Sequence, residues 1–112
     1  MNKPKRLFGI IIITALGIAS TALAQKGDNR IQTHTIFIKD FAFVPDHLTV
    51  SAGDTVIWKN EDVTPHTATD EGVFDSKEID TTKSWTYKAT RKGKFPYTCT
   101  YHPNMHGQLT VQ

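Results

Sequence analysis

The chain has 112 residues, of which 38% are hydrophobic, 21% charged and 10% aromatic, enough for one small globular domain and too few for a large multidomain enzyme. Residues 1–24 hold three basic residues and no acidic one, and the remaining chain has 10 basic residues against 11 acidic ones. This balance argues against a nucleic-acid-binding protein, which normally carries a clear basic excess. The lone cysteine excludes a disulfide within the chain.

The segment 1–24 has the pattern of a secretory signal peptide. A basic start at residues 3–6 precedes an apolar run at 7–19, and Ala-Leu-Ala at 22–24 is a small-x-small cleavage site. Cleavage would leave 25–112 as the exported domain, periplasmic if the host is Gram-negative. A retained membrane anchor is the alternative, because no charge interrupts the chain from the start of the apolar run to the cleavage site.

The remaining chain is predicted to form short strands separated by turns. Thr33–Lys39 is rich in β-branched and aromatic residues, and Phe41–Pro45 is expected to continue extended until the proline. Thr55–Lys59 and Ser84–Thr90 alternate between apolar and polar residues. Shorter strands are expected at Leu48–Val50, Phe95–Cys99 and Gln108–Val111, with turns at Ser51–Asp54 and Arg91–Lys94. No long window has a helical period, so the pattern indicates an all-β sandwich or small barrel.

Aromatic residues at alternating strand positions are the candidate core. They are Phe41, Phe43, Trp58, Trp85, Phe95 and Tyr97. We interpret them as packing residues and not as a binding platform, because period-two placement is typical of burial on one strand face.

Three residues with metal-binding side chains follow the strand that ends at Cys99. Cys99, His102 and Met105 form a C-x2-H-x2-M pattern, and His66 lies in a second loop after another strand. If both loops meet at one end of a sandwich, they supply two imidazoles, a thiolate and a weak thioether. That set is typical of a blue-copper site, in which the soft sulfur ligands suit Cu(I). A metal-bound thiolate would also explain an unpaired cysteine in an exported protein.

Over nearly all of 31–112 the sequence resembles the cupredoxin family of small blue copper proteins. The short C-x2-H-x2-M loop is most similar to that of amicyanin, whereas plastocyanins have a longer interval from histidine to methionine. The other matching stretches are Asp40–Pro45, Leu48–Val56, Trp58–Asn60, Pro65–Thr67, Phe74–Ser76 and Gly93–Val111.

This resemblance implies a cupredoxin-like Greek-key β-sandwich with one type 1 copper ion. His66, Cys99 and His102 would be the strong ligands, Met105 the weak axial ligand, and His102 the surface exit for the electron. The implied function is transfer of single electrons between a redox donor and acceptor that bind transiently, without enzymatic turnover. We expect a periplasmic monomer that contacts a membrane only if the signal segment is retained.

The sequence also departs from the family pattern. Many cupredoxins have asparagine directly after the first ligand histidine, whereas this chain has Thr67, so a hydroxyl must connect the two ligand loops. We expect Thr67 and the backbone near Thr100 to orient the thiolate. Tyr101 and Asn104 replace Pro and Phe of the amicyanin loop, so the patch around the surface histidine is more polar and its partner is not transferable.

Other functions remain open at this level. A periplasmic copper chaperone or storage protein with the same fold is the main alternative, and a thiol enzyme using Cys99 is another. A metal-free adhesion sandwich leaves the ligand spacing unexplained, and a structural zinc site seldom uses a thioether.

The remaining histidines and charged clusters receive minor roles. His34 and His47 are predicted to be surface residues, and His106 to point away from the metal. Glu61 and Asp62 are candidates for an acidic rim that meets a basic partner. The basic turn at 91–94 should be solvated, at the end of the sandwich opposite the metal.

Overall fold

The computed structural model describes residues 30–112. The predicted signal segment 1–24 lies outside the described residues. Within the described part, no helix has the length and apolarity needed to cross a membrane.

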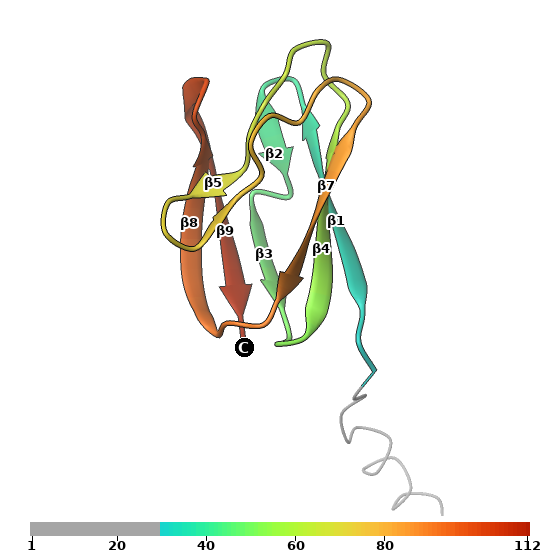
Figure 1. Cartoon of the computed structure of the whole chain (residues 1–112), viewed down its shortest axis with the longest axis vertical. Coiled ribbons are helices and arrows are strands. Elements are labelled where there is room, and N and C mark those ends of the chain that lie inside the picture. The colour runs from blue at the N-terminus through green and yellow to red at the C-terminus, as the bar shows by residue number, and fades with distance from the viewer. Residues whose placement is uncertain (1–29) are drawn as a thin grey trace, which may run out of the picture. The chain divides into compact units, whose positions relative to one another are not determined.

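Residues 30–112 form nine strands in two facing sheets (Figure 1). One sheet has the order β2-β1-β4-β7, with bounds Ala42–Val44, Thr33–Lys39, Asp54–Asn60 and Ser84–Ala89. The other has the order β3-β9-β8-β5-β6, with bounds His47–Val50, His102–Val111, Gly93–Cys99, Thr69–Asp70 and Phe74–Asp75. Parallel pairs β1–β4 and β3–β9 join antiparallel neighbours in these sheets, and the predicted all-β sandwich is confirmed.

The core lies between the sheets and is built from the alternating apolar residues. In β8 the buried positions are Phe95, Tyr97 and Cys99, as the pattern predicts. Trp58 and Tyr97 are fully buried and meet edge to face, with ring centroids 5.4 Å apart. Trp85 is only partly buried and packs against this cluster. The prediction that Phe41 belongs to the core is wrong, because 52% of its surface is exposed.

Two strand predictions differ from the structure. The segment after β1 does not continue extended: the chain reverses at Asp40 and Phe41, and β2 pairs antiparallel with β1. The last strand begins at His102 and not at Gln108, because His102, His106 and Gly107 pair with the end of β8, with a register shift between Thr98 and Cys99. Both differences place additional backbone next to the ligand loops.

Three connections gather at one end of the sandwich (Figure 1). They are the β1–β2 turn, the loop that follows β4 and the β8–β9 turn. The basic turn between β7 and β8 lies at the opposite end, as predicted.

His34 is not the free surface residue that the sequence suggested. Its Nε2 lies 2.9 Å from Asp54 Oδ2, and only 23% of the His34 side chain is exposed. Asp54 also accepts backbone hydrogen bonds from Gln32 and Ser51, both at 3.0 Å. The bond from Gln32, then those from His34 and Ser51, lower the pKa of Asp54 to about 2. This carboxylate therefore joins β1 to the start of β4. His47, by contrast, is exposed as predicted.

Candidate metal centre

His66 is presented by the loop after β4 and is fixed through its backbone. Its N–H donates to the carbonyl of Ile79 at 3.2 Å, and its carbonyl accepts from the N–H of Ile79 at 2.7 Å. The fully buried Asn60 shapes the same loop, because its Nδ2 donates to the carbonyls of Thr64 at 2.9 Å and Ile79 at 3.0 Å. These bonds fix the loop that presents the His66 imidazole, which is fully buried.

Cys99 and His102 flank the turn between β8 and β9. Cys99 is the last residue of β8 and His102 the first of β9, and the two are paired across a two-residue connection. The C-x2-H spacing is therefore a hairpin spacing, which directs both side chains to one side. The Cys99 side chain is buried, whereas His102 is only half-buried.

Three of the four predicted ligands converge. Cys99 Sγ lies 3.5 Å from His102 Nδ1 and 3.8 Å from His66 Nδ1, and the three potential ligand atoms lie within 4.8 Å of one another. Met105 is buried in β9, three residues after His102, and its role as an axial ligand remains a prediction. His106 is exposed on the other side of that strand, as expected.

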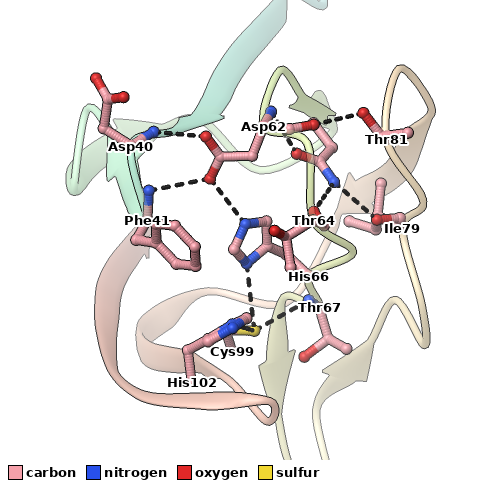
Figure 2. A network of polar contacts seen from close by, with 11 residues as sticks. Asp40, Phe41, Asp62, Thr64, His66, Thr67, Ile79, Thr81, Cys99 and His102 are labelled. Atoms are coloured by element: carbon pink, nitrogen blue, oxygen red, sulfur yellow. Dashed lines mark hydrogen bonds and ion pairs between the residues drawn. The ribbon is translucent and has the colours of Figure 1, made fainter.

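Asp62 fixes which nitrogen of His66 faces the sulfur. Its Oδ2 accepts a hydrogen bond from His66 Nε2 at 2.8 Å. The imidazole proton then sits on Nε2, and the Nδ1 lone pair is free to bind a metal. Figure 2 shows His66 between Asp62 on one side and Cys99 on the other.

The Asp62 carboxylate is held in its charged form by several donors. Burial raises the pKa of this carboxyl, but hydrogen bonds from the Phe41 N–H, His66 and the Asp40 N–H outweigh burial and keep the pKa below its ordinary value. The prediction that Asp62 forms part of an acidic surface rim is therefore wrong, because its side chain is only 10% exposed and contacts His66. Glu61 pairs with Lys39 at 3.7 Å on the surface. An aspartate four positions before a loop histidine is the sequence signal that could have identified this contact.

Thr67 connects the two ligand loops. Its N–H donates to Cys99 Sγ at 3.3 Å, and its Oγ1 accepts from the N–H of Thr100 at 2.9 Å. The hydroxyl thus makes the connection that an asparagine makes in many cupredoxins. The sequence correctly indicated Thr67 as a partner of the sulfur, but the Thr100 amide bonds the hydroxyl instead of the thiolate.

The donor set fits copper better than zinc. One sulfur and two imidazoles are ligands that suit both oxidation states of copper. The Thr67 amide that donates to Cys99 Sγ fixes the position of the sulfur opposite the two imidazoles. These residues therefore form a candidate type 1 copper site.

Comparisons with known proteins agree with this interpretation. The cupredoxin-like domain family matches residues 9–111. Amicyanin of Paracoccus versutus is 27% identical over 67% of this chain, which spans only 61% of that protein. Plastocyanin of Vicia faba is 34% identical over 62% of this chain and 87% of that protein. A methionine-to-glutamine variant of amicyanin in the Cu(I) form superimposes with a TM-score of 0.67 and 26% identity, covering 71% of this chain and 82% of that one.

Proposed function

Because the chain belongs to the cupredoxin-like domain family, we propose that it binds one type 1 copper ion and carries single electrons between redox proteins. His66, Cys99 and His102 would be the strong ligands and Met105 the weak axial one. The convergence of one sulfur and two Nδ1 atoms within 4.8 Å is the observation that carries this proposal. Copper in such a site would supply a one-electron couple.

The residues of the chain contribute rigidity to this function. An electron carrier works fastest when its site changes little between oxidation states. Asp62 holds His66, the Thr67 amide holds the sulfur, and the β8–β9 hairpin fixes Cys99 relative to His102. His66 and Cys99 thus keep their positions through hydrogen bonds to residues that are not ligands.

We further propose that the electron passes through His102. His102 is the half-buried ligand, whereas His66 and Cys99 are buried. A partner that docks at this end of the sandwich would come nearest to the metal at His102. Such contacts are small and short-lived in redox pairs. We also propose that the segment 1–24 directs export to the periplasm and is then cleaved. Mass analysis of the periplasmic protein checks this proposal, because the first residue should be Gln25. The proposed working form is a monomer.

Voltammetry combined with a chelator challenge distinguishes an electron carrier from a copper chaperone or store. A carrier gives a reversible one-electron wave and keeps its copper through repeated reduction in the presence of a Cu(I) chelator. A chaperone or storage protein gives up the metal once reduced. Release of the copper within a few redox cycles would overturn the proposed function.

A further inference from the structure

The β1–β2 turn has an unusual backbone for the residues it contains. Asp40 and Phe41 have φ angles of 51° and 56°, and Lys39 and Ala42 pair on either side of them. Two-residue hairpin turns with positive φ at both positions normally use Asn-Gly or Asp-Gly. Phenylalanine is bulky and rarely adopts this left-handed region. Such strain persists only when the surroundings hold it in place, and it is often found at functional sites.

One carboxylate from a distant loop holds this turn. Asp62 Oδ1 accepts from the Asp40 N–H at 2.6 Å, and Oδ2 accepts from the Phe41 N–H at 3.0 Å. The same Oδ2 accepts from His66 Nε2 at 2.8 Å. Asp62 is itself anchored, because its N–H donates to Asn60 Oδ1 at 2.8 Å. The strained turn and the metal centre therefore share one carboxylate (Figure 2).

This conformation places the Phe41 ring against both imidazoles. The ring centroid is 5.4 Å from that of His66 and 5.1 Å from that of His102, with interplanar angles of 84° and 81°. Edge-to-face contacts at these distances are favourable. Because 52% of Phe41 is exposed, burial in the core does not explain why a phenylalanine occupies a strained turn.

The two imidazoles differ in what else restrains them. His66 is hydrogen-bonded through Nε2 to Asp62. Among residues 30–112, the only hydrogen-bond partner of the His102 ring is Cys99 Sγ, on its Nδ1 side. The His102 ring also packs against the His66 ring, with centroids 4.9 Å apart, but His66 is itself a candidate ligand. Among residues 30–112, Phe41 is therefore the ring outside the candidate ligand set that packs against His102.

We propose that Phe41 is a positioning residue of the metal centre. Asp62 holds the β1–β2 turn in the conformation that sets the Phe41 ring against His102, and the ring keeps this imidazole in the orientation that binds the metal. The inference rests on the proposed copper function. Its content is that the half-exposed side chain of Phe41 helps to keep His102, the candidate ligand closest to solvent, on the metal.

The test compares Phe41→Gly with a matched Phe37→Ala control in the copper-loaded protein. Glycine is favoured at this φ, so Phe41→Gly removes the ring without adding backbone strain. Phe37 lies on β1, before the turn, and is likewise partly exposed, but it has no ring contact with His66 or His102 among the described residues. Transfer of Cu(I) to a chelator should be about 2- to 10-fold faster in Phe41→Gly, the factor expected from one such aromatic contact, and unchanged in Phe37→Ala.

NMR of the diamagnetic Cu(I) protein gives a second readout within the same molecule. In Phe41→Gly the ring resonances of His102 should broaden or double, while those of His66 stay single because Asp62 still holds its ring. Asp62→Asn should affect both imidazoles. Unchanged His102 resonances and unchanged copper transfer in Phe41→Gly would overturn the inference. A wild-type protein that fails to bind copper would instead overturn the proposed function, so the two failures are distinguishable.

Discussion

Replacing Thr67 with valine isolates the hydroxyl that joins the ligand loops. Thr67 Oγ1 accepts from the Thr100 N–H at 2.9 Å and from the Thr69 hydroxyl at 3.0 Å, and lies 3.2 Å from Thr100 Oγ1. A hydroxyl has one proton and two acceptor positions. The Thr67 hydroxyl thus has three polar partners, and it is the acceptor for the N–H of Thr100.

The expected cost follows from which partner is left unpaired in Thr67→Val. The Thr69 hydroxyl keeps an alternative acceptor, Asp75 Oδ1 at 3.1 Å, and the hydroxyl of the exposed Thr100 can bond water. The Thr100 N–H loses its partner in a partly buried position. An unsatisfied buried amide costs about 1–3 kcal/mol, and we expect the free energy of unfolding to fall by that amount.

Denaturant unfolding of the copper-free protein measures this loss. Thr86→Val is the matched control, because Thr86 is an exposed strand residue, and its effect should stay within about 0.5 kcal/mol. The Thr67 amide still donates to the sulfur after the substitution, so the charge-transfer band of the copper-loaded variant should keep its position. A Thr67→Val protein as stable as the wild type would refute the assigned role of the hydroxyl.

Three further predictions test other parts of the structure. Gly107→Ala places a Cβ against the buried Tyr97 ring, 2.8 Å from Cε1, so stability should fall by about 1–3 kcal/mol, and Tyr97→Phe should not restore it because the ring carbons remain. The pKa of Asp54 is about 2 in the folded protein against 3.8 ordinarily, so its stabilising effect is complete above pH 4 and is lost as pH falls towards 2. The stability difference between the wild type and Asp54→Asn should therefore shrink over that interval in acid titrations, and a constant difference would contradict the assignment. Phe41→Gly should be about 1 kcal/mol more stable than Phe41→Ala in denaturant unfolding, because alanine keeps the left-handed strain; the opposite order would show that the turn is not strained.

Features set by neighbouring residues were predictable from the sequence. Alternation along β4 and β8 predicted both strands and their buried faces, because side chains on a strand alternate between its two sides. The spacing from Cys99 to His102 placed two potential ligands in one loop after a strand, and the structure shows that this loop is a hairpin turn. His66 required more, since its approach to them depends on how two loops meet across the sandwich, and there the family resemblance supplied the arrangement.

Features set by contacts between distant segments were missed. Phe41 has the alternating position of a core residue, but the reversal at the β1–β2 turn moves its ring to the metal end. Asp62 looked like a solvated acid because its partners at the β1–β2 turn lie 21 and 22 residues away in sequence. The bond between His34 and Asp54, 20 residues apart, escaped prediction for the same reason.

The central claim is that His66, Cys99, His102 and Met105 bind copper as a type 1 site. Optical and EPR spectra of the Cu(II)-loaded protein test it most directly, with Cys99→Ser as the ligand variant and His106→Ala as a control at an exposed histidine of the same strand. We expect an intense thiolate-to-copper band with a narrow hyperfine splitting, abolished in Cys99→Ser and unchanged in His106→Ala. A weak, ordinary Cu(II) spectrum in the wild type, or one that survives in Cys99→Ser, would contradict the claim.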